Sequence, residues 1–170
     1  GLENRVALVA QIGESVSDGR MVSILDAVRG QAFEAVYLVD QNGKIRANSV
    51  RNMSFDRSQE MIGVDLSTNK LVRAVVEADS VVWSDKFLSA MTGKATIGVG
   101  LPVGYFGDIV IAELPLNALL EISQIASGSG GEDYWVIDGF GEVVADTGSS
   151  SKIGINMLGL DVVKNGLANQ

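Results

Sequence analysis

The chain contains neither cysteine nor histidine among its 170 residues. It therefore has no thiol or imidazole nucleophile and no imidazole base, and it lacks the ligands on which most zinc sites and covalently attached haem depend. The missing cysteine fits a reducing compartment and a bacterial exterior equally well, so it does not locate the protein. We expect no metal, no cofactor and no catalysis of these kinds.

Long apolar runs are also missing. No run reaches the roughly 18–20 apolar residues that a transmembrane helix requires, and no signal peptide is visible. A helical pattern is already under way at Gly1. We therefore expect the chain to be a segment of a longer protein.

Positive charge is scarce, because 13 Lys and Arg residues stand against 21 Asp and Glu residues and give a net charge of −8. Such a surface is repelled by nucleic-acid phosphates and by anionic lipid head groups, so we expect neither as a partner. Aromatic residues make up only 6% of the chain, which gives little support for a carbohydrate-binding or adhesin module. Apolar residues at 46% and charged residues at 20% are typical of a folded protein.

One pattern occurs twice in the chain. Residues 33–49 read FEAVYLVDQNGKIRANS, and residues 134–147 read YWVIDGFGEVVADT. Each copy has an apolar strand led by an aromatic residue, a turn that contains glycine, and a second strand, which predicts a β-hairpin. An Ile-Gly turn and a helical pattern follow both copies, over residues 62–76 and 153–167. The same three features in the same order indicate an internal duplication.

The rest of the first copy alternates between helical and strand-like patterns. A helix over residues 2–31 either packs only on its own sheet or also pairs with a partner's copy. The helix over 69–79 is expected to bury Leu71, Val72, Val75 and Val76. The fold class is then α+β, a five-stranded antiparallel sheet backed by helices. The expected strands and last helix are the hairpin over 34–49, then 81–85, 95–103 and 108–114, and the helix over 116–126.

A Gly- and Ser-rich segment separates the two copies. Residues 127–131 read SGSGG, the composition of a flexible linker. We expect a first domain over residues 1–126 and a second over residues 132–170. The second copy ends before the three strands that complete the first, so the second domain is expected to be incomplete.

These motifs together resemble the double Cache family, the PAS-like extracellular sensor domains of bacterial and archaeal transmembrane receptors. The resemblance is carried by VDQNGKIRANS, IGVDLS, VVWSDKF, TGKATIGVGLPV and DIVIAELPLNALL, and by the repeated WVIDGFGEVVADT. It covers essentially the whole chain. It implies a membrane-distal module at 1–126 and the beginning of a membrane-proximal module from 132.

The resemblance implies a role in sensing. Such domains lie outside the cytoplasm, extracellular or periplasmic, between two spans of a plasma-membrane protein. They bind a small molecule in the distal module and pass a shift to a histidine kinase, a diguanylate cyclase or a chemotaxis signalling domain. We expect this chain not to be an enzyme, and to form a homodimer through its N-terminal helix. The residues also allow a cytoplasmic PAS-like module that dimerises through residues 2–28 and binds no small molecule.

By the same resemblance, the distal pocket lies between the central sheet and the segment that crosses over it. Its wall is then expected to include Trp83, Ser84, Asp85 and Phe87, with Thr96, Gly98 and Glu113 from the strands that follow.

The branch of the family that binds free amino acids uses an Arg-x-Trp-Tyr motif and a later Asp that receives the ligand's amine. Here Trp83 takes the Trp position, but Val81 and Ser84 replace the Arg and the Tyr. Glu113 falls where the amine-binding Asp would lie. The half that clamps a carboxylate is therefore missing. The residues favour an amine or amino-acid-like ligand, because Glu113, Asp85 and the face of Trp83 suit a positive group.

Each of these residues also has a purely structural interpretation. Trp83 is either a platform on which the ligand stacks or a core residue, and Asp85 either faces the ligand or caps the segment that follows. Glu113 lies in an apolar run, in phase with the isoleucines of that run, which favours an inward-facing side chain that needs a partner. Lys94 is most simply a solvated turn residue.

Other motifs do not carry chemistry. Asp40 and Asp138 precede a turn in both copies, and hydrogen bonds to nearby backbone amides explain them. An EF-hand loop fails because Leu38 stands where an oxygen ligand is required. The glycines at 98, 100 and 104 lie within a strand pattern with no helix after them, which excludes a phosphate loop.

Overall fold

The computed structural model describes residues 6, 18–104, 107–116, 118, 135–146, 152 and 154–168. Apart from Val6, the first half of the expected helix over 2–31 lies outside these residues, as do most of the helix over 116–126 and the linker at 127–131. The chain divides into two compact units, residues 1–114 and 115–170, and each is described by itself.

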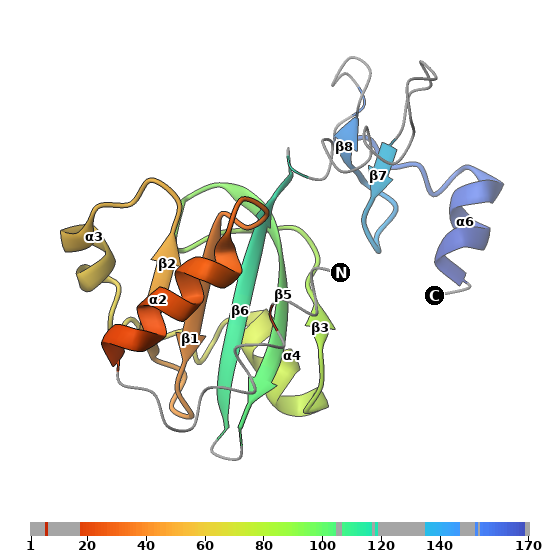
Figure 1. Ribbon diagram of the computed structural model, residues 1–170. Coiled ribbons are helices and arrows are strands. Elements are labelled where there is room, and N and C mark those ends of the chain that lie inside the picture. Colours follow the sequence, from red (N-terminus) through yellow and green to blue (C-terminus); the bar gives the residue numbers. More distant parts are fainter. Residues whose placement is uncertain are drawn as a thin grey trace. The chain divides into compact units, whose positions relative to one another are not determined.

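The first unit is an antiparallel sheet with helices on both sides (Figure 1). The strand order is β2-β1-β6-β5-β3, and β4 also pairs with β5. The α+β class is therefore confirmed, but the sheet has six strands instead of five, because Phe87 and Leu88 pair with Thr96 and Ala95. The elements are α2 (Asp18–Arg29), β1 (Ala35–Val39), β2 (Ile45–Val50), α3 (Phe55–Glu60), α4 (Lys70–Ala78), β3 (Val82–Trp83), β4 (Phe87–Leu88), β5 (Ala95–Val103) and β6 (Asp108–Pro115).

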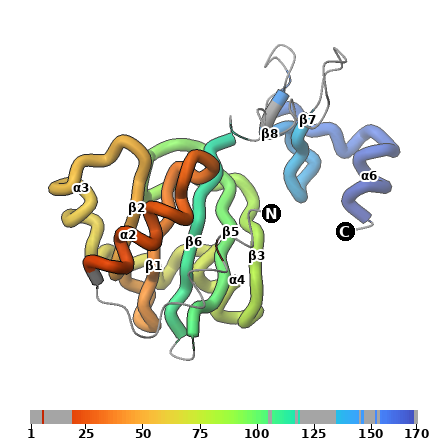
Figure 2. Tube along the Cα trace, in the orientation of Figure 1, coloured from red at the N-terminus to blue at the C-terminus, as the bar shows by residue number. Residues whose placement is uncertain are grey.

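The long strands β5 and β6 run side by side through the middle of the sheet (Figure 2). β1 joins β6 in an antiparallel register that pairs Ala35 with Glu113 and Val39 with Ile109. The first hairpin therefore extends the sheet beside the last strand of the unit. This register places the middle of β1 directly against the apolar run that contains Glu113.

Two apolar cores form, one on each face of the sheet, because side chains along a strand alternate between faces. The core on the α2 face includes Met21 and Leu25 from the helix, with Val36 and Val99 from the sheet. The core on the α4 face has the following buried members: Ala35, Tyr37, Val39, Ile45, Leu66, Leu71, Val72, Val75, Met91, Ile109 and Ile111. The candidate site lies on this second face.

α4 begins and ends at residues suited to those positions. The Asn69 side chain accepts hydrogen bonds from the backbone N–H groups of Leu71 and Val72, and Asp79 ends the helix with a left-handed φ of 45°. Leu71, Val72 and Val75 are buried as expected. The expectation for Val76 is wrong, because it is 64% exposed. One residue advances about 100° around a helix, which turns Val76 away from the sheet.

Two glycines in β5 let α4 lie close to the sheet. A Cβ at Gly98 would stand 2.7 Å from Leu71 Cδ2 and 3.2 Å from Phe87 Cε1. A Cβ at Gly100 would stand 2.6 Å from Val75 Cγ2. The helix side chains therefore occupy the space that β5 leaves open.

The second unit repeats the start of the first. It contains β7 (Trp135–Ile137), β8 (Val143–Asp146) and α6 (Asp161–Ala168), and β7 and β8 form a separate two-stranded antiparallel sheet. The Asp138 carboxylate accepts hydrogen bonds from the N–H groups of Phe140 and Glu142, as Asp40 does from the corresponding residues of the first hairpin. The predicted turn role of both aspartates is confirmed.

The glycines of the two copies also agree, both in the hairpin turn and in the turn after the second strand. Gly43 and Gly141 both have φ of +80°, and Gly63 and Gly154 have φ of +83° and +84°. The Gly63 N–H donates to the Ile45 carbonyl at 2.7 Å, and the Gly154 N–H donates to the matching carbonyl of the second copy at 2.8 Å. The internal duplication is therefore confirmed at the level of individual hydrogen bonds.

The copies differ in what covers their helices. Leu71 on α4 is 4% exposed, whereas Val162, its counterpart on α6, is 75% exposed. In the first unit β5 packs against α4, and the described part of the second unit contains no strand in that place. Among the described residues, no helix is long and apolar enough to cross a membrane.

Candidate functional site

A buried carboxylate lies at the centre of the α4 face. Glu113 on β6 is 1% exposed, and the Tyr37 hydroxyl on β1 donates a hydrogen bond of 2.9 Å to its Oε1. The Ser89 hydroxyl, just after β4, donates to Oε2. Both oxygens of an acid that stands among apolar side chains are therefore satisfied, as burial of a polar group requires.

Burial shifts the titration of this group. Loss of solvent raises the pKa of Glu113, against the lowering effect of the hydrogen bonds from Ser89 and Tyr37, and the nearby negative charge of Glu34 raises it further. Burial also raises the pKa of the Tyr37 hydroxyl, and the charge of Glu113 adds to that effect. The arrangement can hold a proton between these groups or present a carboxylate to a cation.

Ser89 ties a loop to this carboxylate. Its Oγ accepts hydrogen bonds from the backbone N–H groups of Met91 at 3.0 Å and Thr92 at 3.1 Å while it donates to Glu113. Its backbone N–H donates to the Lys94 carbonyl at 2.9 Å. The loop over residues 89–94 is therefore fixed to the base of the site.

Three of the residues predicted for the site, Phe87 on β4 and Thr96 and Gly98 on β5, share the α4 face with Glu113. Thr96 and Gly98 lie two residues apart on β5, and Phe87 pairs with Thr96. The Thr96 hydroxyl donates to the Leu114 carbonyl. The space above Gly98 is filled by Phe87 and Leu71.

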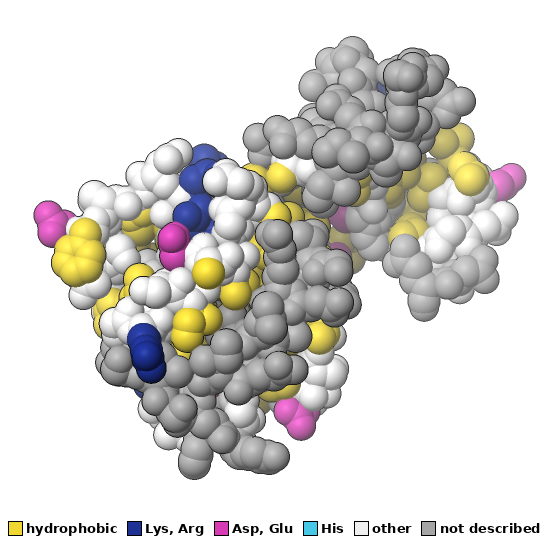
Figure 3. Space-filling model, in the orientation of Figure 1, with side chains coloured by type: hydrophobic (Ala, Val, Ile, Leu, Met, Phe, Trp, Pro, Cys, Tyr) yellow, Lys and Arg dark blue, Asp and Glu magenta, His cyan; other side chains and the backbone are white. Residues whose placement is uncertain are grey.

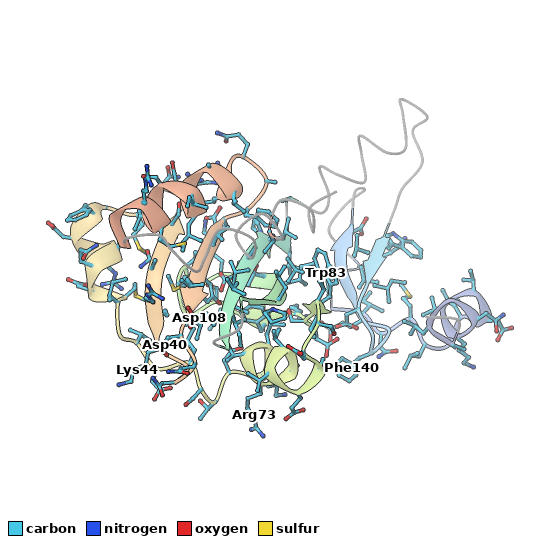
Figure 4. The ribbon with its side chains drawn as sticks, turned by 60° about the horizontal axis from the view of Figure 1, so that its bottom comes forward. Asp40, Lys44, Arg73, Trp83, Asp108 and Phe140 are labelled. Carbon is cyan, nitrogen blue, oxygen red and sulfur yellow. The ribbon has the colours of Figure 1, made fainter. Side chains whose placement is uncertain are left out.

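Trp83 lies on the other face of the sheet. Trp83 pairs with Val99, whose side chain belongs to the core on the α2 face. Directly opposed residues of an antiparallel pair point to the same face, so the structure does not bring Trp83 to Glu113. Figure 4 labels Trp83 on β3, and its side chain is 41% exposed.

The two residues after Trp83 differ in their contacts, because Ser84 is bonded to β5 and Asp85 is not buried. The Ser84 Oγ accepts a hydrogen bond of 2.8 Å from the Gly98 N–H, so it secures β5. Asp85 is exposed, and it caps no helix because β4 follows it.

Tyr37 and Ser89 were not among the predicted site residues. Tyr37 lies in phase with Val39, and its hydroxyl needs a partner when the strand is buried, which is a signal that the sequence contains. Ser89 carries no such signal, because its contact with Glu113 depends on how the loop after β4 closes.

A polar groove opens beside this centre. It has a volume of about 690 Å³ and lies between the residues that follow β2 and the loop that follows β4. Glu34, Arg51, Arg57 and Lys94 supply its charged lining, and Met91 belongs both to its lining and to the core on the α4 face.

A smaller hollow of about 310 Å³ lies at the other end of the hairpin. Its lining includes Asp40, Arg73 and Glu77, and Figure 4 labels Asp40 and Arg73 at that end of the unit. Among the described residues, no group of three acidic side chains could hold a metal ion.

No protein-family model matches the chain, and no curated protein matches it. Solved structures do. An extracellular ligand-binding receptor from Desulfohalobium retbaense DSM5692 is 20% identical at a TM-score of 0.73, over 98% of this chain and 31% of that one. The ligand-binding domain of the Pseudomonas aeruginosa PAO1 chemoreceptor PctC is 18% identical at a TM-score of 0.64, over 93% of this chain and 69% of that one. The sensor domain of the Vibrio cholerae histidine kinase DctB is 18% identical at a TM-score of 0.59, over 88% of this chain and 55% of that one.

At these identities the similarity is one of fold. It covers nearly all of this chain, and so it includes residues of both units. The chain spans less than a third of the first of these structures and more than half of the other two. The resemblance read from the motifs is confirmed at this level: the chain has the fold of the double Cache type of extracellular sensor domain.

Proposed function

We propose that this chain is the extracytoplasmic ligand-sensing region of a membrane-anchored signal transducer, and that its first unit binds a small molecule on the α4 face beside Glu113. The observation that carries the proposal is the buried carboxylate of Glu113, which two hydroxyls hold on an otherwise apolar face. A buried acid costs stability, and perturbed titratable groups gather at functional sites. The shared fold supports the same role.

The favoured ligand is an amine or an amino-acid-like molecule. PctC was solved with GABA, Tlp3 of Campylobacter jejuni with isoleucine and PctB with L-Arg, and each of these ligands carries an amine. A ligand ammonium would replace one of the hydroxyl donors on Glu113. It would keep the carboxylate ionised by direct charge pairing.

Signalling then requires that the ligand favour one of two arrangements, because only a difference in affinity can shift such an equilibrium. α2 packs against β1 and β2 from the opposite face of the sheet. A change around Tyr37 on β1 would therefore reach α2 through the strand itself.

The proposal extends to the organisation of the whole receptor. Residues 1–126 would form the membrane-distal module, 127–131 a linker and 132–170 the start of the membrane-proximal module. The receptor would be anchored in the plasma membrane and would dimerise through its N-terminal helix. Catalysis would belong to a cytoplasmic output domain, either a histidine kinase or a diguanylate cyclase, and a chemoreceptor would signal without it.

A thermal-shift screen of amino acids, amines, carboxylates and purines on the purified chain tests the proposal. A true ligand at about 100 times its Kd stabilises the fold by roughly 2.7 kcal/mol. Glu113→Gln should weaken an amine hit by about 10-fold to 100-fold, because a charged hydrogen bond is lost. Asp85→Asn, the same change at an exposed position, is the matched control and should leave the affinity unchanged.

Trp83→Ala adds a geometric test. Because Trp83 shares the α2 face with Val99, we expect the variant to bind the hit as the unchanged chain does.

If no ligand class shifts the melting temperature and residues 2–28 alone control dimerisation, the chain is instead an interaction module without a small ligand.

A further inference from the structure

The groove between the end of β2 and the loop after β4 has the size of a ligand site. Its volume of about 690 Å³ falls within the roughly 300–1,000 Å³ typical of small-molecule pockets. Its walls come from two segments, residues 50–54 with Arg57 and residues 90–94, together with Glu34 immediately before β1. A molecule in it would contact both walls.

The charge of this lining is opposite to that of the chain. Arg51, Arg57 and Lys94 stand against Glu34, which leaves a net of +2 on a protein whose net charge is −8. Figure 3 shows dark blue Lys and Arg side chains above α2, with a magenta acidic side chain beside them. Arg51 contacts Gly30 and Gln31, which follow that helix. A concave positive region on an acidic protein concentrates anions.

The three cations differ in how firmly they are held. Arg51 donates to the carbonyls of Gly30 and Phe33, and its side chain is only 26% exposed. The side chains of Lys94 and Arg57 are 62% and 67% exposed, and Arg57 forms an exposed ion pair of 3.4 Å with Glu60. Arg51 is therefore a structural cation, and Lys94 and Arg57 are accessible to a solute.

Glu34 is the internal counter-ion of the groove. Its Oε1 lies 2.6 Å from Lys94 Nζ and its Oε2 lies 3.4 Å from Arg51 Nε, while its side chain is only 12% exposed. Lys94 has three donors, so one ammonium can serve both Glu34 and a bound anion. The Glu34 carboxylate competes with that anion for the same charge.

We propose that this groove binds a small dianion through Lys94 and Arg57, with Arg51 holding Glu34 and Glu34 limiting the affinity. The site goes beyond the proposed function, because its ligand is negative and its residues differ from Glu113 and its partners. Lys94 lies on the loop that Ser89 ties to Glu113. An occupied groove would therefore hold the loop whose Met91 packs in the core on the α4 face.

Isothermal titration calorimetry of the whole chain with inorganic phosphate and with malonate tests the site, and neutral malonamide serves as the control solute. At least one dianion should give a saturable heat of binding, with an affinity that falls as salt is added. Malonamide should give no such heat. Lys94→Gln and Arg57→Gln should each lower the affinity for the dianion by about fivefold or more. Glu34→Gln should strengthen it, which a merely structural role for Glu34 would not produce.

Lys44→Gln is the matched control, because it removes the same charge at the opposite end of the hairpin. It should leave the affinity unchanged. The far-UV circular dichroism of each variant verifies that it is folded, and Arg57→Gln keeps the test open if Lys94→Gln does not fold. The proposal is wrong if neither dianion binds, if Lys44→Gln weakens binding as much as Lys94→Gln, or if Glu34→Gln lowers the affinity.

Discussion

Glu113 is the group on which the chemistry of the site depends. It is 1% exposed, and the hydroxyls of Tyr37 and Ser89 donate to its two carboxylate oxygens. The gain or loss of a proton at Glu113 therefore changes a hydrogen-bonded group in the core, where solvent screens its charge little.

The raised pKa of Glu113 predicts a pH dependence of stability. Because burial raises this pKa above the ordinary value of 4.5, the folded chain keeps the proton to higher pH than the unfolded chain does. Stability is then lost as the pH rises from the unfolded pKa through the folded one. Glu113→Gln removes this loss, so the variant should gain stability relative to the unchanged chain over that interval.

Urea unfolding of both proteins at a series of pH values measures the effect. The groups that face Glu113 are Tyr37 and Ser89, with Glu34 near enough to raise its pKa. Asp26 and Asp65 have lowered pKa values, mainly from hydrogen bonds with Arg29 and Ser67. Their stabilisation is lost as the pH falls through those lowered values, equally in both proteins. Parallel stability curves would show that Glu113 titrates normally.

Part of this arrangement was predictable from the sequence. The phase of Glu113 with Ile109 and Ile111 predicted an inward-facing side chain, and the structure confirms its burial. The inward position of Tyr37 was also predictable, because its strand alternates in the same way. The contact of Ser89 was not, since it spans 24 residues and depends on the closure of a loop.

At the scale of elements, long periodic stretches were predictable and short ones were not. β5 has the expected bounds, Ala95–Val103. β3 is only Val82–Trp83, and β4 is a two-residue strand that no alternation could reveal. α3 was not predicted, because it buries no residue and leaves no apolar stripe to detect in the sequence.

The close approach of α4 to β5 depends on glycine. Gly100→Ala should destabilise the fold by about 1–3 kcal/mol, because the new methyl group would overlap Val75 and Ile111 in a packed core. Gly19→Ala in α2 is the matched control, since nothing lies within 4 Å of its added Cβ. Urea denaturation measures both, and an equal effect of the two changes would contradict the packing account.

The repeated turn depends on its aspartate. Asp40→Ala should cost about 1–2 kcal/mol, because two backbone N–H groups lose their acceptor. Glu77→Ala, an exposed carboxylate on α4, should change stability by less than about 0.5 kcal/mol. Urea denaturation compares the two variants, and no loss in Asp40→Ala would mean that solvent replaces the carboxylate fully.

At the scale of the whole molecule, the internal duplication was the feature most fully predictable from the sequence. Matching turns and glycines in the two copies made it visible, and the same hydrogen bonds recur in both. The polar groove was not predictable from the sequence, because Glu34, Arg51 and Lys94 meet only when β1, β2 and the loop after β4 come together. Lys94 was expected to be a solvated turn residue, and its ion pair with Glu34 shows a further role.

The proposed function requires that the first unit bind an amine-bearing small molecule through Glu113. Calorimetric titration of the strongest hit from the thermal-shift screen into the unchanged chain, Glu113→Gln and Asp85→Asn measures it most directly. We expect saturable binding whose affinity falls by about 10-fold to 100-fold in Glu113→Gln only. Equal affinities in all three proteins would contradict it.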